Sequence, residues 1–449
     1  MNFSPFRKLV EHFSIVTGLL LAAMLITWIE ARDRLNTFTF VGFGRSDPLV
    51  VVANAGAPEL ALPNVLTEVQ MTAARTAWTY FESFTNPETG LSNSVETFPS
   101  GTMWDQGSYL VAILAAYRLQ LISYDETRQR IQRVLAALIA LPLVDGQLPN
   151  KVYNTTSLEM TFYNNTPAPT GLGWSALDIA RLTVALKATA KQFPDFADEV
   201  ATIETRWNVN RLVRDGELWG ASRDPSGALV DLQEGRLGYE EYAARGIALL
   251  GLNPARAADW RYQAQNVEIE GIELLVDRRD KENSNGSNYT LSEPYLLTAL
   301  EFGFDPETAQ VAAALYRAQE RRAERTGQLT AVSEDNVDRD PYFLYYSAFA
   351  NGEEWMPISP AAIPYPDLAT VSTKAAFGWH ALYQSEYTQK LVDHVGVTQH
   401  AERGWRSGIF EKTGEINDVA TANTNAMVLL AIHYQGFGPL LPAILRGAL

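Results

Sequence analysis

Acidic side chains stand next to aromatic ones at positions where a helix is expected to begin. Asp105 follows Trp104 directly and precedes an apolar run, residues 110–121. A carboxylate at a helix start either caps the backbone or projects from the helix end into a cavity. The neighbouring aromatic ring offers a broad, flat apolar face of the kind on which a sugar ring can stack. Trp104 and Asp105 are therefore candidates for binding and cleaving a glycosidic bond.

Two further stretches offer the second carboxylate that this chemistry needs. Glu240 follows Tyr239 at the start of an expected helix, and Glu334 and Asp335 lie in an acidic segment. Glycoside hydrolysis uses one protonated and one ionised carboxyl group on either side of the bond. We expect Glu240 to be the general acid, and Asp105 or Asp335 to activate water. Glu334 is a further catalytic candidate, and each of these acids also has a structural explanation as a helix-end or solvated side chain.

The same stretches and the long loops supply residues that could hold a sugar. Aromatic rings would stack on sugar faces, whereas cationic, amide and carboxylate side chains would bond to hydroxyl groups. The predicted substrate-binding residues are Trp104, Tyr239, Trp219, Tyr295, Arg236, Glu293, Lys374, Asn423 and Asn425.

Other chemistries find little support in the residue pattern. The five histidines show no metal-ligand pairing at helical spacing, and there is no cysteine, so we expect no metal site. Nucleophile-elbow, phosphate-loop and dinucleotide motifs are missing from the sequence, and we expect no cofactor. A polysaccharide lyase stays open as an alternative, because Tyr239 with Arg236 could supply a base and a cationic neutraliser.

Composition narrows the class of partner. The chain has 449 residues, of which 47% are hydrophobic, and a formal net charge of −16. That apolar fraction is sufficient for a large core. The acidic balance argues against nucleic acid and favours a neutral or cationic partner over a polyanion. An oligosaccharide or polysaccharide fits this charge.

The first 35 residues form a separate segment. Arg7 and Lys8 precede an apolar run of about 17 residues, 13–29, which is at the short end of a membrane span. We expect residues 1–35 to be a transmembrane signal anchor in the inner membrane, with the large C-terminal part in the periplasm; a cleaved signal peptide is the alternative. Residues 36–62 are expected to be a linker.

The remainder, residues 63–449, is predicted to be all-α. Apolar residues recur at spacings of three and four, and Thr67, Asp125 and Ser372 are placed as helix caps. Twelve helices can pair into six hairpins, which predicts an (α/α)6 toroid around a central pit; an irregular helical bundle is also compatible with the pattern. The predicted helices are 65–84, 105–121, 125–141, 175–192, 196–211, 239–250, 294–302, 306–322, 342–350, 372–383, 386–394 and 422–434.

Six motifs stand out: 102–110 (TMWDQGSYL), 234–244 (EGRLGYEEYAA), 292–297 (SEPYLL), 329–335 (LTAVSED), 372–379 (STKAAFGW) and 421–426 (TANTNA). Together they resemble the bacterial "domain of unknown function" family 3131. The resemblance spans roughly residues 68–434 and implies the fold of six-hairpin (α/α)6 glycosidases. More distant similarity to glucoamylase-like and β-1,2-glucanase families implies an inverting acid/base carboxylate pair, without fixing which carboxylates form it.

Two functions therefore stay open besides the lyase. The preferred one is a glycoside hydrolase that acts on a glucan or exopolysaccharide in the cell envelope. The other is a non-catalytic protein that binds glycan, or assists exopolysaccharide assembly, on the same fold.

Overall fold

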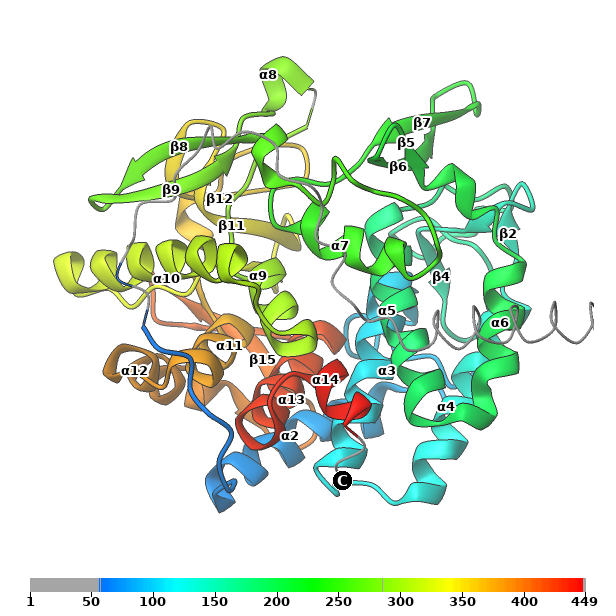
Figure 1. Cartoon of the computed structure of the whole chain (residues 1–449), viewed down its shortest axis with the longest axis horizontal. Helices are drawn as coiled ribbons and strands as arrows, with labels where there is room; N and C mark the ends of the chain where they lie inside the picture. The colour runs from blue at the N-terminus through cyan, green and yellow to red at the C-terminus, as the bar shows by residue number, and fades with distance from the viewer. Residues whose placement is uncertain (1–55, 57, 285, 447–449) are drawn as a thin grey trace, which may run out of the picture. The chain divides into compact units, whose positions relative to one another are not determined.

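Six helices pack against one another in a closed ring (Figure 1). The computed structural model describes residues 56, 58–284 and 286–446. In it α3 contacts α5, α5 contacts α7, and α7 contacts α9; α9 contacts α11, α11 contacts α13, and α13 returns to α3. The ring helices are α3 (Met103–Arg118), α5 (Ala176–Gln192), α7 (Tyr239–Ala248), α9 (Glu293–Leu297), α11 (Thr373–Tyr383) and α13 (Ala422–Phe437).

The ring helices α3, α11 and α13 form the centre of the core because they are buried on nearly every side. α3 buries all of its residues except Tyr117, and α13 is buried over most of its length. A helix that is apolar all round cannot face water, so it must be surrounded by other elements. Side chains of Thr102, Ser175 and Thr421 accept from first-turn amides of α3, α5 and α13, which fixes where these helices begin.

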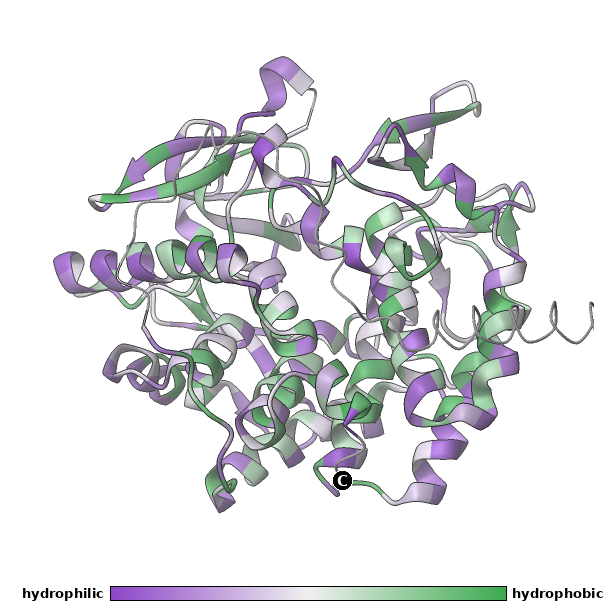
Figure 2. Ribbon diagram, viewed as in Figure 1, coloured by the Kyte–Doolittle hydropathy of each residue, from purple (hydrophilic) through white to green (hydrophobic). Residues whose placement is uncertain are grey.

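Amphipathic helices cover the ring from outside. Their outer faces carry charged residues, as Figure 2 shows for α4 and α10. Thr67 caps α2 in a reciprocal capping box with Gln70, as predicted. The covering helices are α2 (Glu68–Phe84), α4 (Tyr124–Ala140), α6 (Ala197–Thr205), α10 (Pro306–Thr326) and α12 (Glu386–Val395). Two short helices are α8 (Lys281–Ser284) and the apolar α14 (Leu440–Leu445).

Small antiparallel sheets join the helices, so the all-α description is wrong, although the body is mostly helical. Six sheets of two to four strands are present within the described residues. The strands are β1 (Ser100–Thr102), β2 (Leu143–Val144), β3 (Leu148–Pro149), β4 (Val152–Asn154), β5 (Val213–Arg214), β6 (Glu217–Arg223), β7 (Leu229–Gln233), β8 (Ala264–Ile269), β9 (Ile272–Asp277), β10 (Glu334–Asn336), β11 (Phe343–Ala350), β12 (Glu353–Ile358), β13 (Thr370–Ser372), β14 (Gln399–His400), β15 (Gly404–Phe410) and β16 (Ile416–Ala420).

One predicted helix is a strand. Residues 342–350 were expected to be helical, but β11 occupies almost the same span and is the central strand of the β10–β11–β12 sheet. Asp335 pairs with Leu344, and Tyr346 pairs with Pro357. Aromatic residues dominate this stretch, and they favour a half-buried pleated surface. The consequence for the site is large, because this sheet carries Glu334 and Asp335.

The other predicted helices lie within a few residues of their expected positions, except 196–211, where α6 ends at Thr205 and a separate 3-10 turn covers Val209–Arg211. Two starts differ in detail: Ser123 rather than Asp125 caps α4, and the Ser372 side chain makes no cap bond to α11. The predicted helix 294–302 is α9 followed by a π-helical turn, η4 (Thr298–Phe302). No helix in the described ranges is long and apolar enough to cross a membrane. The predicted anchor, 1–35, lies outside those ranges.

Candidate active site

The N-terminal ends of five ring helices open into one cavity of about 1220 Å³. Each contributes a side chain from its first turn: Asp105 on α3, Asp178 on α5, Tyr239 on α7, Lys374 on α11 and Asn423 on α13. The first amides of a helix lack intrahelical partners, and this end of the helix carries a partial positive charge. Because these helix ends converge on the cavity, their partial positive charges stabilise carboxylate groups there.

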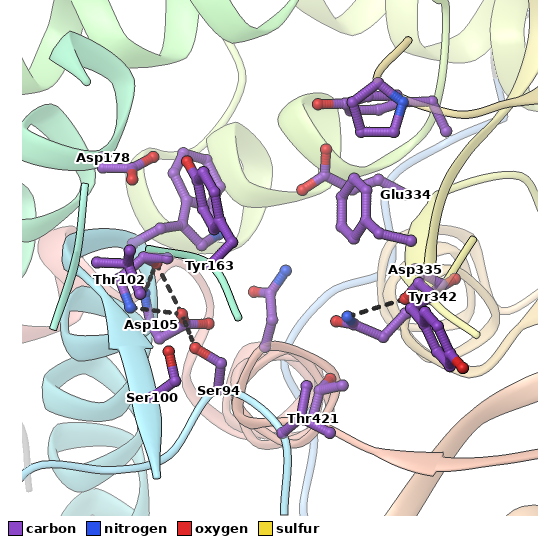
Figure 3. A pocket seen from close by; sticks show the side chains of 18 of the residues that line it. Ser94, Ser100, Thr102, Asp105, Tyr163, Asp178, Glu334, Asp335, Tyr342 and Thr421 are labelled. Carbon is purple, nitrogen blue, oxygen red and sulfur yellow. Dashed lines mark hydrogen bonds between the residues drawn. The ribbon is translucent and has the colours of Figure 1, made fainter. Parts of the chain in front are cut away.

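Asp105 is held rigidly on the first wall. Its Oδ2 atom accepts from the backbone N–H of Thr102 at 3.0 Å and from the Thr102 hydroxyl at 2.7 Å. The Ser94 hydroxyl donates to the same atom (Figure 3). Thr102 accepts in return from the amide of Asp105, so the pair forms a capping box. These bonds all engage one carboxylate oxygen, which orients the group at the edge of the cavity.

Asp178 and Glu234 complete the first wall. Glu234 accepts from the first amide of α5, that of Ala176, at 2.5 Å. A Cβ at Gly220 would lie 2.5 Å from Glu234 Oε2, so only glycine leaves room for this carboxylate. Burial, together with the charges of Glu234 and Asp105, raises the pKa of Asp178 to about 8. Asp178 therefore keeps its proton at neutral pH unless a cation approaches.

The second wall comes from β10, on the other side of the cavity in Figure 3. Burial raises the pKa of Glu334 to about 8, and the charge of Glu293 adds to the effect while Lys374 opposes it. Burial likewise raises the pKa of Asp335 to about 7, against the opposing charge of Lys374. Glu334 is thus protonated at neutral pH, which is the state that a general acid requires.

A buried ion pair forms the floor beneath this wall. Lys374 contacts Glu293 directly and lies 3.7 Å from Asp335 Oδ1. Asn423 donates to the other oxygen of Glu293 at 2.6 Å. Burial lowers the pKa of Lys374, but the carboxylates around it outweigh that effect and raise it. The ammonium group therefore stays charged and fixes the geometry of the second wall.

Aromatic side chains line the cavity between the two walls. Trp104 and Tyr239 meet edge to face, with ring centroids 5.7 Å apart. Tyr289 stacks on Tyr345 at 4.3 Å with the ring planes 3° from parallel. Tyr163 stands beside Asp178 on the first wall (Figure 3). Flat apolar faces next to carboxylates suit a sugar, whose rings are apolar on their faces and polar at their edges.

Seven of the thirteen predicted site residues line this cavity. They are Asp105, Glu334, Asp335, Trp104, Tyr239, Lys374 and Asn423. Glu293 lies just behind the lining, where it holds Lys374 and Asn423 in place.

Glu240 and Arg236, by contrast, do not line the cavity. Both Glu240 oxygens accept from Arg279, at 3.1 and 2.5 Å, and the carboxylate also accepts from Gln233. Arg236 donates to Gly235 O at 2.6 Å and Ser284 Oγ at 3.0 Å. A carboxylate so fully engaged has no free proton to give, so the geometry does not favour Glu240 as general acid.

Trp219, Tyr295 and Asn425 also lie away from the cavity. The guanidinium of Arg214 covers the Trp219 ring at 4.2 Å. Tyr295 lines a separate, much smaller hollow. Asn425 accepts from the backbone N–H of Trp405 at 2.8 Å and is fully buried. These three side chains support the fold around the site.

Asp178, Glu234 and Tyr163 are the main site residues that the sequence analysis missed. A usable signal exists for Asp178: Ser175 and Asp178 repeat the spacing of Thr102 and Asp105, a hydroxyl followed three residues later by an acid. That spacing marks a capping box. At α5 the Ser175 hydroxyl accepts from the amide of Asp178 without the reciprocal bond that Asp105 makes at α3, and in both helices the acid at this position lines the cavity.

Comparison with solved structures gives the same fold. A candidate glucoamylase from Bacteroides caccae aligns with a TM-score of 0.63 at 13% identity, over 84% of this chain and 96% of that one. An endo-β-1,2-glucanase from Chitinophaga pinensis, solved with sophorotriose and glucose, aligns at 0.59 and 10% identity, over 85% and 95%. An endo-β-1,2-glucanase variant from Talaromyces funiculosus, solved with β-1,2-glucan, aligns at 0.56 and 13%, over 85% and 86%.

These similarities establish a glycosidase-like fold. No curated protein matches the chain significantly. The model of one protein family matches residues 72–438, which is most of the chain and includes both walls of the cavity. The chain belongs to that family, the "Protein of unknown function (DUF3131)" family.

Proposed function

We propose that this protein is a glycoside hydrolase that acts on a glucan or an exopolysaccharide. The observation that carries the proposal is the pair of carboxylate walls that face each other across an aromatic cavity (Figure 3). The fold supports it, because proteins with this fold include endo-β-1,2-glucanases solved with their oligosaccharides.

Glu334 is the proposed general acid and Asp105 the proposed base. Glu334 carries a proton at neutral pH because its pKa is raised to about 8. Asp105 stands on the other wall with its orientation fixed by three donors. An acid and a base on opposite sides of a sugar-sized space leave room for a water molecule, which is the inverting arrangement. Asp335 is the alternative base.

The remaining predicted residues have roles in holding the sugar. Trp104 and Tyr239 present aromatic faces, and Asn423 and Lys374 lie at the floor among the hydroxyl-binding positions. We further infer that the helical ring and its outer helices form an (α/α)6 toroid. We also propose that residues 1–35 anchor it in the inner membrane, with the catalytic body in the periplasm.

Release of reducing ends from a panel of β-1,2-, β-1,3- and β-1,4-glucans tests the proposal. Glu334→Gln and Asp105→Asn should each lower the rate about 10²–10⁴-fold, the usual contribution of general acid–base catalysis. Asp231→Asn is the control, because Asp231 is ion-paired with Arg211 and Arg214 outside the cavity. Absence of product from every polymer would refute hydrolysis of these neutral glucans, and equal rates for wild type and Glu334→Gln would refute Glu334 as the general acid.

A further inference from the structure

The cavity holds more carboxylates than hydrolysis requires. Of those that line it, Asp335 is near Lys374, Asp338 pairs with Arg339, and Asp418 pairs with Arg403 and Arg406. The other four have no ion-pair partner among the described residues: Asp105, Asp178, Glu234 and Glu334. The proposed mechanism uses Glu334 and Asp105. Glu234 accepts from the first amide of α5, but neither Glu234 nor Asp178 has an assigned part in binding or cleaving a ligand.

No lysine or arginine among the described residues forms an ion pair with Asp178 or Glu234, although the charge of Lys151 favours the ionised form of both. Lys151 lines the same side of the cavity, but its Nζ donates to Ser222 Oγ at 2.7 Å and, in the part of the chain that the structure describes, pairs with neither acid. Burial and the charges of Glu234 and Asp105 keep Asp178 protonated in the free cavity. A bound positive charge would favour the ionised form of Asp178, whereas a neutral hydroxyl group would not.

The surroundings also favour a ligand rich in hydrogen-bond donors. On the second wall, Asp335 Oδ2 has no partner in hydrogen-bonding geometry, although its side chain is only 4% exposed. A buried acceptor left without a donor is costly. An ammonium group brings three donors and no acceptor, whereas each hydroxyl group brings acceptors as well. Tyr163, beside Asp178 in Figure 3, adds an aromatic face to which a cation is attracted.

We propose that Asp178 and Glu234 bind an ammonium group, and that the glycan taken by this cavity therefore carries free amino groups, as a de-N-acetylated hexosamine polymer does. The inference rests on the proposed function for the identity of the ligand as a glycan. It adds that the sugar is positively charged and that Asp178 and Glu234 bind this charge.

The test compares ligands that differ only in the amino group. Binding of a glucosamine tetrasaccharide and of its fully N-acetylated form to the full-length chain is measured by calorimetry at two ionic strengths. The free amine should bind at least about tenfold more tightly, which corresponds to one partly buried charge pair. The preference should shrink at high salt, because salt screens charge. Binding of the amine should also release protons, since Asp178 ionises to meet it.

Two variants locate the effect. Asp178→Asn should abolish the preference for the amine, whereas Asp418→Asn, a cavity acid already ion-paired with arginines, should keep it. Equal affinities for the two forms, binding of neither, or equal behaviour of the two variants would overturn the inference. Cleavage of neutral β-glucan without any amine preference would leave the hydrolase standing and remove only this inference. Selective amine binding without cleavage of any glycan would support the amine site and remove the hydrolase proposal.

Discussion

At the scale of single residues, environment separates the acids that sequence could not tell apart. Glu240 and Glu334 both stand near aromatic residues in the sequence. In the structure Glu240 is bound by Arg279, while no ion pair holds Glu334 among the described residues and its carboxyl group lines the cavity. The difference depends on Arg279, which follows β9 in the chain. The sequence around Glu240 or Glu334 contains no local pattern that predicts this contact.

The raised pKa of Glu334 predicts the pH dependence of activity. A general acid works only while it holds its proton, so turnover should fall as pH rises through about 8. Initial rates between pH 5 and 10 on the best polymer of the panel would give this limb of the profile. In Glu334→Gln the limb should disappear from the residual activity. A wild-type rate that keeps rising beyond pH 9 would argue against Glu334 as the acid.

At the scale of elements, the strongest signal was the helical spacing of apolar residues. It placed the ring helices within a few residues, because their burial follows directly from that spacing. The helical spacing gave a wrong prediction at β11. This segment is a strand because it pairs with β10 and β12, and the spacing of its own apolar residues does not indicate that. Distant partners decide such segments, and a single sequence does not show them.

A buried ion pair ties the ring together below the cavity. Arg181 on α5 contacts Glu301 on η4, and both are fully buried. Tyr242 on α7 accepts from Arg181 at 2.8 Å and donates to Glu301 at 2.9 Å. The guanidinium also lies 5.8 Å from the centroid of Trp104, on α3. Three ring helices and the turn after α9 therefore depend on one network.

Breaking this pair from one side should be costly. Arg181→Met leaves the Glu301 charge buried without its partner, and the free energy of unfolding in urea should fall by about 3–5 kcal/mol. The double variant Arg181→Met with Glu301→Met should recover much of that loss. Lys390→Met serves as control, because its pair with Glu386 is exposed on α12 and should give no measurable change. Equal losses in the single and double variants would contradict this account.

At the scale of the whole molecule, carboxyl groups that keep their protons make stability depend on pH. Asp178, Glu241 and Glu334 have pKa values raised to about 8, and Asp335 to about 7, chiefly by burial. Between pH 6.5 and 8 the folded chain holds protons that the unfolded chain has already released. Stability must therefore decrease as pH rises through this window.

The expected decrease from pH 6.5 to 8 is on the order of a few kcal/mol. Urea unfolding at several pH values would measure it, and Asp178→Asn should make the dependence shallower. The same decrease should operate below pH 6.5, down to the ordinary carboxyl range at about pH 4, because the folded chain keeps these protons throughout. Burial lowers the pKa of His433 to about 3, and the proton that the unfolded chain binds there offsets only part of the trend. Stability that increases steadily from pH 6.5 to 8 would contradict the burial of these acids.

The arrangement of the ring explains why the site lies where it does. Residues separated by more than 300 positions, such as Asp105 and Asn423, meet because their helices start at the same end of one ring. The sequence indicated helices with acids and aromatics at their starts. It did not indicate which starts converge, since that follows from the order in which the helices close the ring.

Cleavage in ¹⁸O-labelled water tests the central claim most directly. If an acid on one wall and a base on the other direct water at the glycosidic bond, each cleaved bond places one heavy oxygen at the new reducing end. Mass spectrometry of the oligosaccharides released from the best glycan substrate should show that label in wild type and almost no product in Glu334→Gln. Unlabelled products with an unsaturated sugar at the cleaved end, or an intact polymer, would contradict the account.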